Sequence, residues 1–579
     1  MAERFDSEDR AWPSRPWIMA AIGAVGGLVI HLLTDGHTGY NQTFPVWKQA
    51  ATAFTVVATI AFLLTVELRR WTWSAGFALC WGVVIALVGW FTSQYNLQGE
   101  IMEFPFLSGI LAVLVAAPLF QTIRDEAAWR FPYARLHRHA WTDAVIGAAS
   151  LAFTGVTFLL AWLIASLFDV IGIDALKDLL KEEWFGWTLA GFAFGAAVGL
   201  LRERDALVAT LQKLVMVVFS VLAPVLAVAL AAFLLSLPFK GLSGLWDSDI
   251  PATPLLLLSG AGAILLANAV IGDGREERSS NRWLQYTALA LVLTVLPLAI
   301  LAMVSMGQRI GQYGWTPERM WGVVAVGIAV AYGLAAWWAA GKGRLGYDDK
   351  LRPLQTKLAI GLCGLAFFLA LPIVDFGAIS ARSQLARLNS GQVKAEEFDW
   401  TAMAFDFGPE GRERLKEIAR AGEAKQRQLA GTALKTKNRW DLSRETEIVE
   451  RQADIEKKVR LLSPDIRWSD ELKRRVSALG DCSERQQCAL IRLAPDKLVL
   501  LRTYADERYL SASIIDLAVS LPSSAGAVKT PDVVEIVATD TPAMKDVDLG
   551  KAKIEIRDVA IRQVYVDERP VGQGVRISR

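Results

Sequence analysis

The feature that most restricts this fold is a series of long apolar runs in the first two thirds of the chain. As an α-helix, a run of about 17 or more apolar residues crosses the roughly 30 Å of hydrocarbon in a bilayer. We identify eleven such runs, of which 186–201 is the shortest: 16–33, 48–66, 72–91, 104–121, 142–170, 186–201, 212–237, 254–271, 283–306, 318–340 and 358–379. A polytopic α-helical membrane protein is therefore predicted.

Composition agrees with this prediction. Hydrophobic residues make up 53% of the 579 residues, which is too apolar for a soluble chain of this length. Many tryptophans stand near the ends of the runs, where amphipathic rings favour the membrane interface. The first run follows a segment of mixed charge, MAERFDSEDR, and no small-residue cleavage site follows it. We therefore interpret it as an uncleaved first span.

Lysine and arginine are distributed unequally between the loops on the two sides. Loops on the side of the N-terminus hold twenty of these residues, and loops on the other side hold six. Cytoplasmic loops carry the excess of Lys and Arg in membrane proteins, so the N-terminus is predicted to be cytoplasmic. With an odd number of spans, the segment after the last span is predicted to lie outside the cytoplasm.

The chain then divides into three parts. Residues 1–15 form a cytoplasmic tail, 16–379 a transmembrane helical domain, and 380–579 an extracytoplasmic α+β domain. Within the last part, the pattern is helical over 392–480 and strand-rich over 487–579, where CALIRLA, KLVLLRTY, DVVEIVA, KIEIRDVAIRQVYV and VGQGVRIS stand. A helix is expected over about 443–462, with Ile448, Ile455, Val459 and Leu462 on one face.

Cys482 and Cys488 are the only cysteines of this last domain and stand six residues apart. A disulfide between them suits an oxidising compartment, and two free thiols are the alternative. The other two cysteines, Cys80 and Cys363, lie inside apolar runs, where a thiol behaves as a small apolar side chain.

Proline is the one regular feature of the spans. Pro224, Pro297 and Pro372 each stand about 13 residues into a run that crosses in the same direction. They are candidate kinks that line a shared cavity, and chance is the competing explanation, since proline is common in membrane helices. Seven runs have no ionisable residue in their middle thirds, which argues against an ion-coupled transporter.

The tract YGWTPERMWG, residues 313–322, opens the tenth run. Thr316 is a helix cap, Pro317 suits the first helical position, and Glu318 favours the positive end of the helix dipole. Glu318 and Arg319 are also a candidate polar pair at the outer face. The segment RLHRHAW, with His137 and His139 on different helix faces, is interpreted as a basic loop that faces lipid headgroups.

No catalytic, cofactor-binding or metal-binding residues are predicted. All four histidines lie outside the extracytoplasmic domain, and the chain has no Walker loop, dinucleotide fingerprint or HExxH motif. The lipid bilayer is one predicted partner, a periplasmic or membrane protein is a further candidate, and no nucleic acid is expected.

Three segments resemble a known family. The chain is similar to the bacterial membrane proteins of the domain of unknown function 4153 family in RFPYARLHRHAW, in IGQYGWTPERMWG, and in ISARSQLARLNSGQVKAEEFDWTAMAFDFGPEGRERL. The likeness covers most of residues 130–420, and the YGWTPER tract is its most specific part. It implies a multi-pass protein of the bacterial inner membrane and implies no activity, substrate or catalytic residue.

Three functions remain open on these grounds. The preferred hypothesis is an envelope scaffold, sensor or assembly factor without a catalytic centre, whose periplasmic domain binds a partner. A transporter or flippase would use a polar cavity between the kinked spans. A membrane enzyme that acts on lipid-linked substrates would gather the acids of several outer loops, such as Asp174, Asp178 and Glu182, around one pocket.

Overall fold

The computed structural model of the chain consists of two compact units. One comprises Met1–Gln392 with Ala402–Arg414, and the other Val393–Thr401 with Leu415–Arg579; we call them the N-terminal and the C-terminal unit. The structure describes residues 12–35, 45–93, 100–241, 251–436, 439, 442, 455–479, 482, 486–504, 510–517, 561–566 and 569–576.

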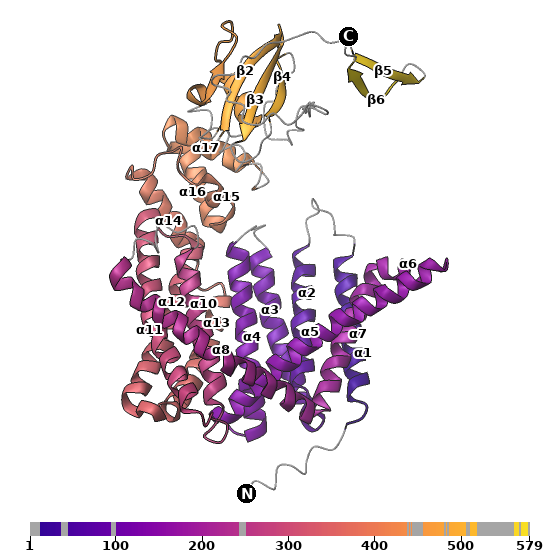
Figure 1. Cartoon of the computed structure of the whole chain (residues 1–579), viewed down its shortest axis with the longest axis vertical. Helices are drawn as coiled ribbons and strands as arrows, with labels where there is room; N and C mark the ends of the chain where they lie inside the picture. Colours follow the sequence, from indigo (N-terminus) through magenta and orange to yellow (C-terminus); the bar gives the residue numbers. More distant parts are fainter. Residues whose placement is uncertain are drawn as a thin grey trace. The chain divides into compact units, whose positions relative to one another are not determined.

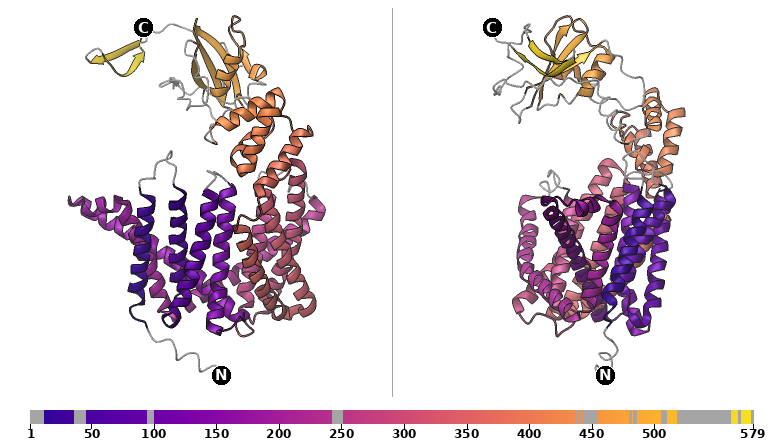
Figure 2. Two further views of the ribbon diagram at one scale, coloured as in Figure 1. Left: turned by 180° about the vertical axis from the view of Figure 1, so that it is seen from behind. Right: turned by 90° about the vertical axis from the view of Figure 1, so that its right-hand side faces the viewer.

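The N-terminal unit is an all-helical bundle (Figures 1 and 2). Within the described residues, eleven helices are long and apolar enough to cross a membrane, which confirms the predicted number. They are α1 (Arg15–Thr34), α2 (Val46–Thr65), α3 (Trp71–Ser93), α4 (Glu100–Glu126), α5 (Tyr133–Val170), α7 (Glu183–Arg202), α8 (Asp205–Lys240), α10 (Ala252–Ile271), α11 (Arg282–Tyr313), α12 (Pro317–Gly343) and α13 (Asp348–Ala370). Shorter elements of the unit are η2 (Leu68–Arg70), α6 (Ala175–Lys181), η3 (Arg344–Gly346) and α14 (Phe376–Asn389).

Glycines bring α1 and α7 into backbone contact. A Cβ atom built on Gly23 would lie 2.0 Å from the carbonyl oxygen of Gly191, and one on Gly195 would lie 2.1 Å from that of Met19. No side chain fits into such an approach, so glycine is required at these positions. The glycines that the sequence places at helical spacing therefore pack two spans of one chain against each other.

The second half of the bundle packs around alanine and branched aliphatic side chains. Helices α8, α10, α11 and α12 and the start of α13 contribute to one buried apolar cluster. Alanines such as Ala263, Ala288 and Ala302 are fully buried there, which allows the helices to approach closely.

Most helices differ in their bounds from the predicted runs, and two of these differences have a clear local cause. α5 begins at Tyr133, nine residues before the predicted start of the fifth run, because nothing between Pro132 and that run interrupts a helix. The last span ends at Ala370 and not at residue 379. Leu371 takes an extended conformation (φ −79°, ψ 147°), as expected for a residue that precedes proline, and Asp375 then caps α14 with its side chain.

The helices that follow α14 in the described part of the chain are short. They are α15 (Trp400–Phe405), α16 (Gly408–Ala421), α17 (Ala424–Lys435) and α19 (Asp470–Leu479). α17 begins with a reciprocal capping box between Glu423 and Gln426. Trp400 is almost fully buried, stacks edge-on against Phe398 and donates a hydrogen bond to the carbonyl oxygen of Ala395 at 2.8 Å.

A four-stranded sheet forms the core of the C-terminal unit. Its strands are β1 (Val459–Leu461), β2 (Gln486–Ala494), β3 (Lys497–Tyr504) and β4 (Leu510–Asp516), in the spatial order β1-β2-β3-β4. β2, β3 and β4 are antiparallel neighbours, and β1 is parallel to β2. A separate hairpin joins β5 (Ile561–Val566) and β6 (Arg569–Arg576).

The prediction for this unit is partly confirmed. CALIRLA and KLVLLRTY lie in strands, as do VGQGVR and the end of KIEIRDVAIRQVYV, whereas DVVEIVA and the last two residues of VGQGVRIS lie outside the described residues. The helix expected to extend to residue 462 is wrong at its end, because Val459–Leu461 pairs with β2 as a strand. β4 was not predicted, although apolar and polar residues alternate over LSASI at its start.

Candidate functional site

Three arginines from three spans converge on the end of α2. Arg15 of α1 donates a hydrogen bond to the carbonyl oxygen of Val66 at 2.9 Å, and Arg202 of α7 donates to the same oxygen at 3.1 Å. Arg124 of α4 donates to the carbonyl oxygen of Thr65 at 2.5 Å. We call Arg15, Arg124 and Arg202 the arginine cap. It satisfies carbonyl groups that a helix leaves unpaired, at the end where the helix dipole favours positive charge.

Acidic side chains balance the arginine cap. Glu67 lies 3.0 Å from both Arg15 and Arg202, and Asp143 lies 3.6 Å from Arg202. Gln121 donates to the Asp143 carboxylate at 2.9 Å. A buried ion pair contributes little net stability, but removal of one partner leaves an uncompensated buried charge. The network therefore fixes how these spans fit together.

The prediction that RLHRHAW forms a loop is wrong. These residues lie in the first turns of α5, where His137 is buried and its Nδ1 lies 3.1 Å from the Tyr133 hydroxyl. His139 faces Asp125 of α4, with 2.9 Å between its Nε2 and the carboxylate. The two histidines do lie on different faces of the helix, and both pack against the protein.

A similar network of arginine and aspartate occurs in the second half of the bundle. Asp348, which is fully buried, lies 3.1 Å from Arg278 and 3.0 Å from Arg352. Arg352 also donates to the carbonyl oxygen of Ile271, the last residue of α10, at 2.7 Å. Burial next to the Asp348 carboxylate raises the pKa of the Tyr347 phenol. Arginine thus closes the end of a second span.

At the other end of the bundle, α14 holds the tract that enters α12. Gln384 donates to the carbonyl oxygens of Tyr313 and Trp315 at 2.9 and 3.0 Å, and Arg387 donates to that of Gln312 at 2.5 Å. The Trp315 amide donates to the Ser383 hydroxyl at 3.3 Å. The tract is therefore clamped by the helix that follows the last span.

Arg319 of the predicted outer-face pair contacts the segment that precedes α12. Arg319 donates to the carbonyl oxygen of Gly314 at 2.7 Å and lies over the Tyr313 ring, 5.4 Å from its centroid. Glu318 is exposed in the first turn of α12. The Arg319 amide lies 3.4 Å from the Thr316 hydroxyl, which is the helix cap that the sequence predicts.

The three candidate kinks do not form one set. Pro224 lies inside α8 and Pro297 inside α11, but Pro372 lies beyond the end of α13 and kinks no helix. Ala223 and Leu298, which adjoin the first two prolines, are buried in the same apolar cluster. The surroundings of both helical prolines are thus packed with apolar side chains.

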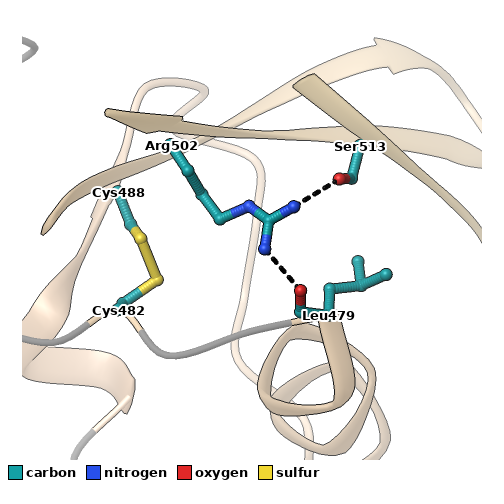
Figure 3. Close-up of a disulfide and its surroundings, with 5 residues drawn as sticks. All are labelled: Leu479, Cys482, Cys488, Arg502 and Ser513. Carbon is teal, nitrogen blue, oxygen red and sulfur yellow. Dashed lines mark hydrogen bonds between the residues drawn. A yellow bond between two sulfur atoms is a disulfide. The ribbon is translucent and has the colours of Figure 1, made fainter. Parts of the chain in front are cut away.

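An arginine also binds the carbonyl group at the end of α19 in the C-terminal unit. Arg502 of β3 donates to the carbonyl oxygen of Leu479 and, at 3.0 Å, to the Ser513 hydroxyl of β4 (Figure 3). In the structure, Cys482 and Cys488 form a disulfide beside this contact, with 2.03 Å between their sulfur atoms. Both cysteines are buried in the core of this unit.

An open cleft of about 720 Å³ lies in the C-terminal unit, where β1 and β2 end. Its residues are Leu462, Ser463, Pro464, Asp465, Arg492, Leu493, Ala494 and Pro495. Arg492 forms an ion pair with Asp465, and Leu493 is 42% exposed. The cleft therefore offers exposed apolar side chains, Leu493 among them, beside a charged pair.

Sequence reasoning assigned Arg15, Arg124 and Arg202 to membrane orientation and missed their packing role. A usable signal existed, because Asp143 stands within the first residues of the predicted fifth span and needs a cationic partner. Among the described residues, no group of three or more His, Cys, Asp or Glu side chains is arranged to hold a metal ion.

Fold and charge network together define a polytopic α-helical membrane protein with a small sheet-containing unit at its C-terminus. The chain belongs to the family described as Domain of unknown function (DUF4153), whose model matches residues 49–417. This match confirms the resemblance carried by the YGWTPER tract. No curated protein and no solved structure matches the chain.

Proposed function

We propose that the chain is a multi-pass protein of the bacterial inner membrane that holds its C-terminal unit in the periplasm. There the unit serves as the partner-binding part of an envelope scaffold, sensor or assembly factor, without a catalytic centre of its own. The contacts of the buried charged side chains support this proposal. The buried arginines and acids of the N-terminal unit join helix ends to one another through hydrogen bonds and ion pairs.

The unequal loop charge supports the sidedness of this proposal. Twenty Lys and Arg residues stand in or next to the loops predicted on the side of the N-terminus, against six on the other side. The cysteine pair 482 and 488 fits an oxidising compartment, where disulfides persist.

Fusions to alkaline phosphatase, which is active only in the periplasm, test the sidedness. A fusion after Asn389, at the end of α14, is expected to be active, and one after Arg130, between α4 and α5, inactive. The reverse pattern would refute the proposed orientation.

The partner-binding role is tested in the living cell with a photo-crosslinking amino acid. We expect a probe at Leu493, in the open cleft, to capture one envelope protein reproducibly. A probe at Leu517, which is 38% exposed and lies outside the residues of the cleft, is the matched control. Equal capture by both probes, or none by either, would argue against a partner at this cleft.

A further inference from the structure

Three spans, α4, α12 and α13, enclose a groove of about 210 Å³ within the N-terminal unit. The three helices stand side by side in the bundle (Figure 1). The groove is lined by Phe104, Leu107, Ser108, Leu111, Trp321, Val324, Ala325, Ile328, Leu362, Leu365, Ala366 and Leu369. Leu107 and Leu111 are 58% and 40% exposed, so the groove opens on the outer surface of the bundle.

The groove runs along the helix axes. On each helix its lining extends over about two turns, or roughly 10 Å at 1.5 Å per residue. At one end the Phe104 ring stacks on Trp321 with 5.6 Å between centroids, and Trp321 packs edge-on against Phe376 at 5.4 Å. This aromatic end lies next to the start of α12 and thus at the end of a span.

The lining leaves no polar group for a polar ligand. Ser108 is its only polar side chain apart from the tryptophan ring, and its hydroxyl already donates to the carbonyl oxygen of Ala366 at 2.9 Å. Water needs two or more polar partners in a buried site, and a polar solute needs them for orientation. The occupant must therefore be a flexible hydrocarbon chain, which is what surrounds a membrane span.

Charge at the aromatic end selects the headgroup. Glu318 precedes Trp321 by three residues, so the two side chains lie on the same face of α12, and the carboxylate is exposed. The guanidinium of Arg319 is engaged by the carbonyl oxygens of Tyr313 and Gly314. The guanidinium keeps its positive charge in these hydrogen bonds. A headgroup at this end therefore meets a carboxylate and a cation together, which suits a headgroup that carries both an amine and a phosphate.

We propose that this groove binds one acyl chain of a phospholipid whose headgroup carries an amine, such as phosphatidylethanolamine. The site is independent of the scaffold role proposed above, because it requires no partner protein and no particular position of the C-terminal unit.

Native mass spectrometry of the full-length protein tests the site after release from nanodiscs that contain equal amounts of phosphatidylethanolamine and phosphatidylglycerol. We expect one tightly held phosphatidylethanolamine on the unchanged protein. Ala325→Phe places a ring in the groove and is expected to weaken this binding about tenfold, as the loss of about two buried methylenes does. Ala229→Phe, at an exposed alanine of α8, is the matched control and is expected to retain the lipid.

A second measurement gives an answer even if the Ala325→Phe variant does not fold. A benzophenone side chain at Leu111 is expected to crosslink to phospholipid after detergent has stripped the loosely bound lipid. The same probe at Leu114, which is 60% exposed on α4 outside the lining, is expected to lose its crosslink under these conditions. Equal crosslinking at both positions would overturn the proposal, as would equal lipid retention by both phenylalanine variants.

Headgroup choice is tested by Glu318→Gln. The amine-selective site predicts that the variant still holds one phospholipid and loses its preference for phosphatidylethanolamine over phosphatidylglycerol. An unchanged preference would remove Glu318 from the site, and recovery of a prenyl lipid in place of phospholipid would refute the proposed occupant.

Discussion

Gly195→Ala is expected to separate α1 from α7 and to destabilise the N-terminal unit. A Cβ at this position would lie 2.1 Å from the carbonyl oxygen of Met19 and 2.8 Å from its carbonyl carbon. Real Cβ atoms essentially never come within 3.0 Å of another heavy atom, so the helices must part by about 0.9 Å or more, the difference between 3.0 and 2.1 Å. The contact is with backbone, which cannot rotate away as a side chain can.

The expected cost follows from this displacement. A radial gap of about 0.5–1 Å forfeits a quarter to a half of each dispersion contact along the helix pair. Overpacked sites of this kind cost about 1–3 kcal/mol. Alanine gains up to about 1 kcal/mol over glycine in helix propensity, which offsets part of this cost. The net loss expected for Gly195→Ala is therefore up to about 2 kcal/mol.

The α7 helix contains its own control. A Cβ on Gly186 would meet nothing within 4 Å, so Gly186→Ala brings the propensity gain without the clash. Reversible unfolding of both variants in mixed micelles, with the full chain, measures the difference. If Gly195→Ala proves as stable as Gly186→Ala, the close approach of α1 and α7 is wrong.

Arg202→Lys is expected to keep the membrane orientation, because the charge remains. It is expected to lower the free energy of unfolding by about 1–3 kcal/mol, because a carbonyl group is left unpaired. Arg275→Lys, at a side chain that is 81% exposed, is the control in the same unfolding assay and is expected to be near neutral. Replacing both cysteines of the 482–488 bridge with serine is expected to lower the stability of the C-terminal unit by about 2 kcal/mol on the chain-entropy model. Thermal unfolding of the full chain with and without reductant checks this expectation, and a reductant-insensitive wild type would contradict it. Arg387→Ala is expected to speed amide hydrogen exchange across residues 312–316, whereas Arg382→Ala on the same helix, 68% exposed, should leave exchange there unchanged. Glu318→Gln is expected to leave folding nearly intact, and a large loss of membrane-inserted protein would show that the exposed carboxylate has a structural role.

The sequence predicts the spans well and their ends less well. An apolar run of sufficient length dictates a helix, since an unpaired backbone group in hydrocarbon costs several kcal/mol. The end of the last span depends on a local competition instead. Apolar residues continue past Ala370, but Pro372 forces Leu371 out of the helical region and Asp375 starts a new helix. Hydropathy alone therefore does not predict where this helix ends.

The candidate site was less predictable, for a physical reason. Arg15 and Arg202 stand next to apolar runs in the same way as exposed arginines do, and only the fold brings them to the end of α2. The outer pair is the opposite case. Glu318 and Arg319 are adjacent and were predicted together, but the hydrogen bonds of the guanidinium to the carbonyl oxygens of Tyr313 and Gly314 could not be predicted from that adjacency.

The arginines of this chain both orient the spans and bind the ends of helices, and lysine could do only the first of these equally well. Positive charge of either kind biases the orientation of a span, because that bias depends on charge near the ends of the span. Only the planar guanidinium reaches two acceptors in a fixed geometry, as Arg202 does with Glu67 and the carbonyl oxygen of Val66. Burial of such a group is tolerated where helix carbonyls and a carboxylate replace its water. The positive end of the bundle is therefore a packed interior that links α1, α2, α4 and α7, and its charge pattern follows as much from packing as from orientation.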